Sequence, residues 1–283
     1  MSSICVAPIY KLKEFNNLFI ELTAKNCNHK CRSCYIDFGL SSELSSVKKT
    51  VKDFISIDKI KEALMNDLKG VKLHCVYLTG AEPMTHPDFN AILRMCLKKC
   101  NVCICTNGSF LNEKKIRFLN RVESEGLGQI FFNLSLTHYD ELMNDEVKYR
   151  GHFRQTIFAL KTLSRYNFTS VLTVQNYYKL EKNVLLEKFK QIFKENEILN
   201  IELQINVSYP NYEDENFSQP SEKTDCMYGR CLTSNGIYSC PFLANDYRGR
   251  VGFNFKNFSE NITAETDFCA TCSKNNNFIF TIG

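Results

Sequence analysis

Three cysteines stand close together near the N-terminus, in a segment that reads NCNHKCRSCY. Cys27, Cys31 and Cys34 have the spacing C-x3-C-x2-C. Three thiolates can hold three irons of a [4Fe–4S] cubane and leave the fourth iron open to a ligand that is not protein. A structural zinc site normally closes its coordination with a fourth side chain, and no fourth cysteine lies nearby in the sequence. The spacing therefore favours an iron–sulfur cluster, with zinc as the alternative.

The elements that must position these thiols are predicted by hydrophobic periodicity. Short β-rich runs alternate with longer segments whose apolar residues recur at spacings of three and four, a pattern typical of a parallel sheet with crossover helices. The expected strands are Leu18 to Ala24, Val71 to Thr79, Val102 to Thr106, Gln129 to Leu136, Thr169 to Val174 and Asn200 to Ser208. The expected helices are Ile57 to Leu68, Phe89 to Lys99, Glu113 to Glu123, Phe153 to Ser164 and Val184 to Lys194.

Six β/α units are fewer than the eight of a complete barrel. We therefore expect an α/β fold in which residues 1–210 form an open, partial (β/α)6 TIM barrel. Its site should lie on the loops after the carboxyl ends of the strands, where the cysteine triplet stands. Residues 209–222 are polar and poorly periodic, which is typical of a linker or surface loop. Residues 211–283 should then form a small cysteine-rich domain.

Five further cysteines lie in this C-terminal part: Cys226, Cys231, Cys240, Cys269 and Cys272. Distant pairs, brought together by a turn around Gly236, could supply four thiolates to a second metal site. A closed site of this kind would contribute folding free energy to a region that has little core of its own. Four thiolates suit both zinc and an iron–sulfur cluster, so the spacing leaves the metal open.

The remaining cysteines and the histidines have no ligand-like partners in a loop. Cys100 and Cys103 have a ligand spacing, but packing is the favoured role because Cys103 and Cys105 share one face of a predicted strand. We expect core or surface thiols at Cys5, Cys75, Cys96, Cys100, Cys103 and Cys105, which fall on predicted strands, a helix or the N-terminal arm. The histidines near strand ends and helix starts are expected to be cap or loop residues, and no catalytic role is assigned to them.

Cys27, Cys31, Cys34 and Tyr35 together resemble the C-x3-C-x2-C-aromatic motif of the radical S-adenosylmethionine (SAM) enzymes. The resemblance implies a [4Fe–4S] cluster on the three cysteines, with SAM bound to its open iron through the methionine amino and carboxylate groups. Members of this family use one electron from the reduced cluster to cleave SAM to a 5′-deoxyadenosyl radical. The resemblance covers about residues 16 to 210.

The turns after the next strands carry the same resemblance. Thr79 to Pro83 is similar to the family's Gly-Gly-Glu-Pro turn, which meets the SAM ammonium; Ala81 replaces the second glycine and is tolerable if its φ is negative. Arg150 resembles an arginine that binds the SAM carboxylate in a bidentate fashion. The residues to which the resemblance assigns SAM binding are Tyr35, Gly80, Ala81, Glu82, Asn107, Ser135 and Arg150.

The C-terminal cysteines resemble the start of the SPASM extension of radical SAM maturases. Only 11 residues follow Cys272, so we expect the shorter twitch form with one auxiliary [4Fe–4S] cluster, or zinc as the alternative. The resemblance implies that its ligands are Cys226, Cys240, Cys269 and Cys272. Cys231 is then an alternate ligand, a buried thiol, or a catalytic hydrogen-atom donor, as a cysteine is in radical SAM peptide epimerases.

Composition and charge limit the partners. Thirty-five Lys and Arg against 31 Asp and Glu leave a net charge of +4 with both signs interspersed, so we expect no nucleic acid. No apolar run approaches the roughly 20 residues of a spanning helix, and the N-terminus lacks a hydrophobic core of secretory length. We therefore expect no membrane and a cytoplasmic location with reduced thiols. The resemblance implies an electron donor such as flavodoxin or ferredoxin.

The expected function is that of a radical SAM oxidoreductase or peptide maturase, which would epimerise or cross-link a peptide. About 16 residues precede the first strand, too few for a leader-peptide recognition domain. The alternative enzyme is therefore a dehydrogenase of a small molecule, either a sugar or an aminocyclitol. The non-enzymatic alternative is a binding protein in which both cysteine groups hold zinc.

Overall fold

The computed structural model describes residues 17–34, 53–207, 224–225, 229–244, 249–259 and 263–264. Six parallel strands lie side by side in chain order. They are β1 Asn17–Thr23, β2 Cys75–Gly80, β3 Asn101–Cys105, β4 Ile130–Leu136, β5 Thr169–Asn176 and β6 Ile201–Val207. This parallel α/β sheet agrees with the expected partial barrel.

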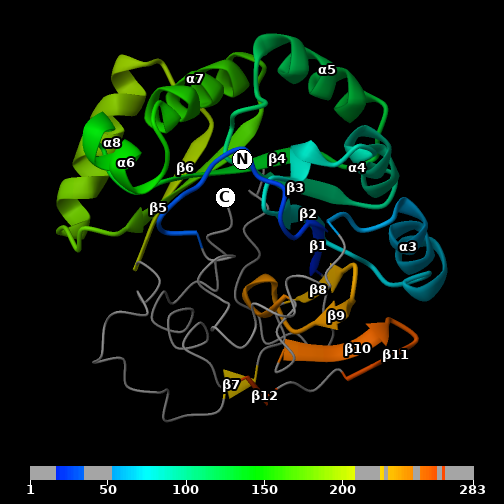
Figure 1. The fold of residues 1–283 in the computed structure, drawn as a ribbon. Coiled ribbons are helices and arrows are strands. Elements are labelled where there is room, and N and C mark those ends of the chain that lie inside the picture. The colour runs from blue at the N-terminus through cyan, green and yellow to red at the C-terminus, as the bar shows by residue number, and fades with distance from the viewer. Residues whose placement is uncertain are drawn as a thin grey trace.

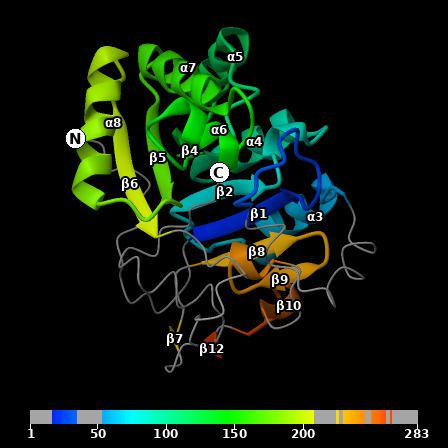
Figure 2. The same cartoon turned by 60° about the vertical axis from the view of Figure 1, so that its left-hand side comes forward.

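Helices cover the outer side of the curved sheet (Figures 1 and 2). They are α3 Ile57–Glu62 with a π-helical continuation Ala63–Asp67, α4 Phe89–Leu97, α5 Glu113–Ser124, α6 Glu141–Val147, α7 His152–Arg165 and α8 Lys182–Glu195. The periodicity does not predict α6, because only Asn144 and Val147 of its residues are buried. In the part of the chain that the structure describes, none of the helices is long and apolar enough to cross a bilayer.

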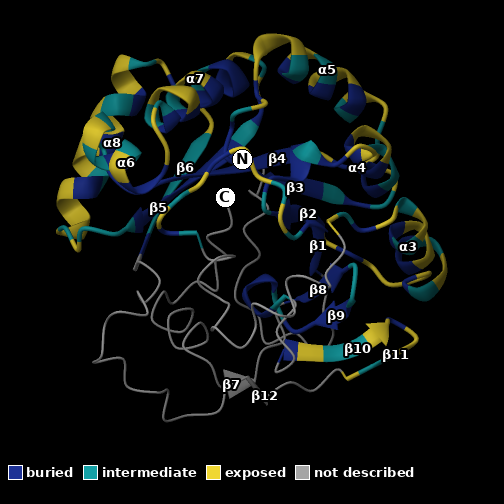
Figure 3. Ribbon diagram, in the orientation of Figure 1, coloured by how far each residue is buried: buried dark blue, intermediate teal, exposed yellow. Residues whose placement is uncertain are grey.

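Side chains alternate between two faces along each strand, as the pleat of a strand requires. Leu18, Ile20 and Leu22 belong to the outer face, which packs against the helices in one large hydrophobic core. The inner face carries a second cluster of aromatic, thiol and aliphatic side chains, namely Phe19, Cys75, Tyr77, Cys103, Cys105, Phe131, Cys231, Tyr238, Phe242 and Leu243. Figure 3 shows strands β1 to β5 mostly buried, and many exposed residues on the outward sides of the helices. Both faces of the sheet are therefore covered.

Strands after residue 229 continue the same sheet. β8 Arg230–Thr233 pairs in parallel with β1, and β9 Gly236–Tyr238, β10 Arg250–Asn254 and β11 Asn257–Phe258 follow in antiparallel order. A separate pair is formed by β7 Thr224–Asp225 and β12 Thr263–Ala264. A short 3-10 turn, Pro241–Leu243, follows β9. The sheet is thus continuous from β6 to β11, while the expected boundary at residue 210 stays a prediction.

Gly80 ends β2 in close contact with the backbone of Thr23 on β1. Its φ is +117°, and an added Cβ would lie 2.3 Å from the carbonyl oxygen of Thr23. The next residue, Ala81, has no positive φ, and its N–H donates to that Thr23 carbonyl at 2.8 Å. Glycine is therefore required at position 80, whereas alanine is accommodated at position 81, as expected from its place in the motif.

The variant Gly80→Ala should lose about 3 kcal/mol of unfolding free energy, because the new Cβ meets backbone and the residue keeps a positive φ. Urea unfolding followed by circular dichroism measures this loss. Gly70→Ala is the matched control, since Gly70 has a φ of +90° but no atom within 4 Å of an added Cβ, and should lose only about 1 kcal/mol. Equal losses in the two variants would contradict a tight contact with Thr23.

Candidate functional site

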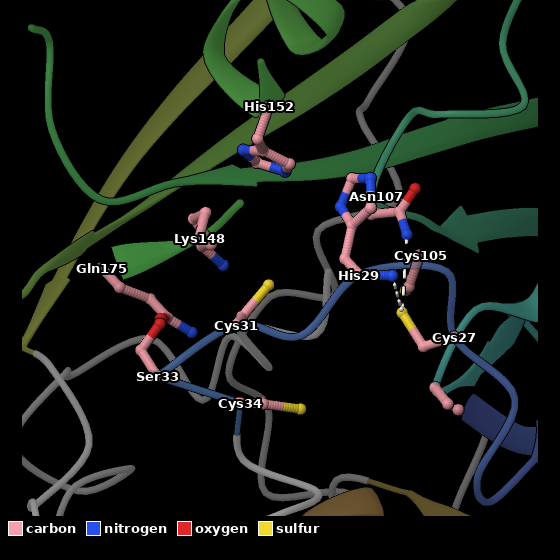
Figure 4. Close-up of a pocket in the computed structure, with 12 residues that line it drawn as sticks. Cys27, His29, Cys31, Ser33, Cys34, Cys105, Asn107, Lys148, His152 and Gln175 are labelled. Atoms are coloured by element: carbon pink, nitrogen blue, oxygen red, sulfur yellow. Dashed lines mark hydrogen bonds between the residues drawn. The ribbon is translucent and has the colours of Figure 1, made fainter. Parts of the chain in front are cut away.

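The loop after β1 lines a pocket at the carboxyl ends of the strands (Figure 4). The pocket has about 560 Å³ of empty space, counting space open to solvent. The residues that line it are Cys27, His29, Cys31, Ser33, Cys34, Gly80, Ala81, Cys105, Asn107, Lys148, His152 and Gln175. The three cysteines of the triplet therefore share one pocket with residues from β2, β3, β5 and the segment after α6.

Hydrogen bonds join the loop after β1 to the turn after β2. The N–H of Glu82 donates to the carbonyl of Asn26 at 3.0 Å. The hydroxyl of Thr85, in the 3-10 turn Pro83–Thr85, donates to the same carbonyl at 3.3 Å. The N–H of Asn26 donates to the side chain of Thr23 at 3.0 Å. The chain is therefore fixed immediately before Cys27.

The carboxylate of Glu82 connects the turn after β2 to the turn after β3. It accepts hydrogen bonds from the N–H of Met84 at 3.1 Å, from the N–H of Asn107 at 2.9 Å and from the hydroxyl of Thr106 at 2.9 Å. Glu82 is completely buried. Burial raises the pKa of Glu82 to about 7, because the loss of water outweighs the three hydrogen bonds that favour the charged form.

Asn107 extends this connection to the cysteine loop. Its Nδ2 donates to Oδ1 of Asn28 at 3.0 Å and to Sγ of Cys27 at 3.6 Å, and its Oδ1 accepts from the N–H of Ser109 at 2.9 Å. The same sulfur accepts from the N–H of His29 at 3.3 Å. Burial raises the pKa of the Cys27 thiol to about 11, and these two donors act in the opposite direction, toward the thiolate that binds a metal.

A buried lysine faces the pocket from the segment after α6. Lys148 donates from Nζ to the hydroxyl of Ser135 at 2.8 Å. Burial lowers the pKa of Lys148, while the charges of Cys31, Cys34 and Cys27 act in the opposite direction. The loop and this segment are also joined by their backbones, since the N–H of Arg32 donates to the carbonyl of Val147 at 2.7 Å. A basic side chain is thus held beside the three thiols.

Two histidines complete this side of the pocket. His29 stacks on Tyr149 with 4.7 Å between ring centroids and meets His152 edge-on at 5.4 Å. Burial lowers the pKa of both His29 and His152, and the nearby Lys148 lowers it further. Nδ1 of His29 is buried without a hydrogen-bond partner.

The donor set fits a cubane rather than a single ion. Among the described residues, no three His, Cys, Asp or Glu side chains converge as a mononuclear site requires. Each thiolate of a cubane binds a different iron, so its three sulfurs must surround a space instead of meeting at a point. The sulfurs of Cys27, Cys31 and Cys34 turn toward the space between them (Figure 4).

Some of the predicted SAM-binding residues line the pocket, and others do not. Gly80, Ala81 and Asn107 line the pocket. Ser135 is buried behind Lys148 and accepts its hydrogen bond. Glu82 does not line the pocket, because its carboxylate is engaged by the turns.

Arg150 is exposed and does not line the pocket. Lys148 faces the pocket instead, because α6 ends at Val147 and the following residue leaves the helical conformation, with φ −87° and ψ −86°. The assignment of SAM binding to Arg150 stays a prediction.

The other candidates lie away from the pocket or outside the described residues. Cys231 is fully buried on β8, paired across the strands with Phe19 and Tyr238, and burial raises the pKa of its thiol. Cys240 is partly exposed and precedes the 3-10 turn Pro241–Leu243. The candidates outside the described residues are Tyr35, Cys226, Cys269 and Cys272.

The predicted site residues did not include six residues that line the pocket, namely His29, Ser33, Cys105, Lys148, His152 and Gln175. Cys105 stands two residues before Asn107, so the period of two along a strand places both on one face. That alternation was the signal that could have identified Cys105. Of the cysteines expected as core or surface thiols, Cys75, Cys96, Cys100, Cys103 and Cys105 are buried, and Cys5 lies outside the described residues.

Comparison with known families agrees with this geometry. Residues 22–183, more than half of the chain, match the Radical SAM superfamily. The chain therefore belongs to this superfamily, whose members use a [4Fe–4S] cluster and SAM.

Two solved structures of SuiB share the fold. SuiB of Streptococcus suis superimposes with a TM-score of 0.59 at 16% identity, over 86% of this chain and 64% of SuiB. SuiB bound to S-adenosylmethionine gives 0.58 at 15% identity over the same shares, and methylornithine synthase (PylB) gives 0.47 at 16% identity, over 68% of this chain and 53% of PylB. The chain thus spans less than two thirds of the length of SuiB. A search of curated proteins found no match.

The raised pKa of Glu82 predicts a pH dependence of stability. A glutamate with the ordinary pKa of 4.5 titrates in the unfolded chain, whereas Glu82 titrates at about 7 when folded. Between these values the folded state binds more protons, so stability falls as the pH rises from about 4.5 to about 7. Relative to Glu82→Gln, which does not titrate, the wild type should lose about 2.5 kcal/mol of unfolding free energy between pH 5 and pH 8.

Urea unfolding of both proteins across this pH range measures the difference. Glu187→Gln serves as the control, because Glu187 is 73% exposed on α8 and its removal should leave the profile parallel to that of the wild type. A parallel profile for Glu82→Gln as well would show that Glu82 folds with an ordinary pKa.

Proposed function

We propose that this chain reductively cleaves SAM and abstracts a hydrogen atom from a substrate, and that the substrate is a peptide. The observation that carries the proposal is the shared pocket of Cys27, Cys31 and Cys34 with the turns after β2 and β3. Membership of the Radical SAM superfamily supplies the chemistry, and this pocket is the part of the described structure with the donors for it.

The three cysteines would hold three irons of a [4Fe–4S] cluster. The bound cluster, once reduced, supplies the electron that cleaves SAM, and the resulting 5′-deoxyadenosyl radical takes a hydrogen atom from the substrate. The chain's own contribution is to hold and tune the ligands. The N–H groups of His29 and Asn107 that point at Cys27 withdraw charge from its sulfur, and hydrogen bonds to ligand sulfurs help to set a cluster's potential.

Lys148 is the residue that we assign to the SAM carboxylate. Among the described residues that line the pocket, it is the one with a basic side chain other than histidine, and a buried ammonium makes a strong charge-assisted hydrogen bond. Gly80 and Ala81 line the same pocket. A structure of SuiB holds S-adenosylmethionine, and the shared fold supports the same ligand here.

A second [4Fe–4S] cluster in a twitch-type or SPASM-type C-terminal region is part of the proposal. Its ligands would be Cys226, Cys240, Cys269 and Cys272, with zinc as the alternative metal. Cys240 packs against the inner hydrophobic cluster of the barrel, which would bring an auxiliary site close to the inner face of β1. We propose flavodoxin or ferredoxin as the electron donor and the cytoplasm as the location.

Iron content and SAM cleavage test both clusters. Anaerobic reconstitution should give brown protein with about eight irons per chain and dithionite-dependent formation of 5′-deoxyadenosine. Replacing Cys27, Cys31 and Cys34 together by alanine should remove about four irons and abolish the cleavage, whereas Cys240→Ala should remove about four irons and keep it. Cys96→Ala, at a buried thiol of α4, is the control and should keep both. Cleavage of SAM by the triple variant would refute the assignment of the site.

The mass of the product separates the candidate reactions. A peptide product of unchanged mass indicates epimerisation, in which a thiol returns a hydrogen atom; Cys105 lines the pocket, whereas Cys231 does not. A loss of two hydrogens from a peptide indicates a cross-link. The same loss from a sugar or aminocyclitol would replace the peptide proposal by the small-molecule dehydrogenase. Mass spectrometry of reactions run in deuterated water also detects the hydrogen that a thiol returns.

A further inference from the structure

One histidine of the pocket has a ring nitrogen that the chain itself does not use. His152 begins α7 and lines the pocket of the three cysteines. No described residue forms a hydrogen bond with its Nε2, yet Nε2 is not one of the buried atoms that lack a partner. Nε2 therefore keeps accessible surface, although the residue as a whole is only 1% exposed. A ligand in the pocket can reach this atom.

Asn144, on α6, meets the other ring nitrogen of His152. Its Oδ1 accepts from the N–H of Thr137 at 2.9 Å and from the hydroxyl of the same residue at 3.2 Å. A backbone N–H can only donate, so this bond identifies the oxygen of the amide and directs Nδ2 to the other side. Nδ2 donates to Nδ1 of His152 at 3.3 Å and to the carboxylate of Asp145 at 3.1 Å.

The position of the proton on His152 follows from this order of donors. An amide nitrogen cannot accept a hydrogen bond, so Nδ1 of His152 is an acceptor and carries no proton. The one proton of the neutral ring is then on Nε2, the nitrogen with accessible surface. Burial and the charge of Lys148 hold the pKa of His152 well below 6.5, which agrees with a neutral ring.

Contacts on several sides keep this ring in place. The carboxylate of Asp145 accepts from the N–H of Gly151 and from the N–H of Phe153, so the backbone is fixed on both sides of His152. The ring of His29 meets the ring of His152 edge-on. The negative charge of Asp145 is on the Nδ1 side, where Nδ2 of Asn144 contacts both residues. Nε2–H is therefore a donor whose direction is set before any ligand arrives.

A second donor lies close to His152. Lys148 lines the same side of the pocket (Figure 4), and its charge acts on the ring of His152. An ammonium and a neutral N–H together suit a group with two acceptor atoms and one negative charge, as in a carboxylate. A phosphate dianion would find only one cation among the described residues of the pocket, and a cationic group would be repelled by Lys148.

We infer that Nε2 of His152 donates a hydrogen bond to the carboxylate of SAM, whose other oxygen meets Lys148, and that Asn144 is the positioning residue that keeps the proton on Nε2. SAM is the source of the carboxylate because His152 and Lys148 share their pocket with the three cysteines. This inference rests on the proposed function, and it deepens that function by naming a second donor to SAM and the residue that orients it.

Binding of SAM and of decarboxylated SAM by matched variants tests the contact of His152. Equilibrium dialysis with the anaerobically reconstituted, unreduced protein measures both dissociation constants without cleavage. His152→Asn, whose amide is too short to reach the place of Nε2, should weaken SAM binding about tenfold and leave binding of decarboxylated SAM unchanged. His152→Gln, whose amide nitrogen can take that place, should bind SAM within about threefold of the wild type. His138→Asn is the control, because His138 is also buried but does not line the pocket.

Nitrogen-15 NMR of the histidine-labelled, reconstituted protein tests the role of Asn144. The wild type should carry the proton of His152 on Nε2, in signals that are absent from His152→Gln. In Asn144→Asp the new carboxylate accepts from Nδ1, so the proton should move to Nδ1 and SAM binding should weaken at least tenfold. Repulsion by Asp145 should also lower the Tm of this variant, so the position of the proton is the readout that a merely structural role would not change.

Four results would overturn the inference. They are SAM binding by His152→Asn as tight as by the wild type, equal weakening for SAM and decarboxylated SAM, a loss in His152→Gln as large as in His152→Asn, and a wild-type proton on Nδ1. In each case, dithionite-dependent cleavage of SAM by the wild type would leave the proposed function intact. A preference for the carboxylate that depends on His152, without any cleavage, would support the inference and refute the proposed function.

Discussion

The buried carboxylate of Glu82 holds three separate loops of this protein in one arrangement. It accepts hydrogen bonds from the turns after β2 and β3, and the N–H of the same residue donates to the loop after β1. Because these bonds lie away from water, each is strong, and the loss of one would leave a buried group unsatisfied. Cysteines that share a cluster must keep their mutual positions, and this connection lets Cys27 and Asn107 behave as parts of one rigid unit.

Around that unit, the outer face of the sheet mainly stabilises the fold, and the inner face carries the side chains near the pocket. The outer face is aliphatic and packs on helices, so it supplies hydrophobic stabilisation whatever the pocket contains. The inner face is thiol-rich and aromatic near β1 and amide-rich near β6. Each strand contributes to both faces, because successive side chains along it point to opposite sides of the sheet.

The sequence predicted the parallel strands well because their apolar alternation is a local property. The expected strand Thr169 to Val174 lies within β5, and the expected helix Glu113 to Glu123 nearly coincides with α5. The pairing of β8 with β1 was not predictable, since strand pairing over some 200 residues leaves no periodic signal along the chain. The helix α6 was missed because it is short and buries little.

The candidate site shows the same division between local and distant information. The cysteine spacing and the turn at Gly80 are local, and the structure brings them to one pocket. Lys148 depends on where a helix ends, and Cys105 and Gln175 depend on which face of a strand turns inward, so all three needed the fold. The sequence motifs were sufficient to predict where the pocket lies, whereas the other residues that line it depend on how the chain packs.

The parallel pairing of β8 with β1 has a consequence for the shape of the sheet. β1, the strand that leads into the cysteine loop, is an interior strand because β8 covers the side that β2 leaves open. A chain shortened before Arg230 would turn β1 into a bare edge with unpaired backbone groups, a surface prone to join other molecules. Among the described residues, β8 thus shields β1 from self-association.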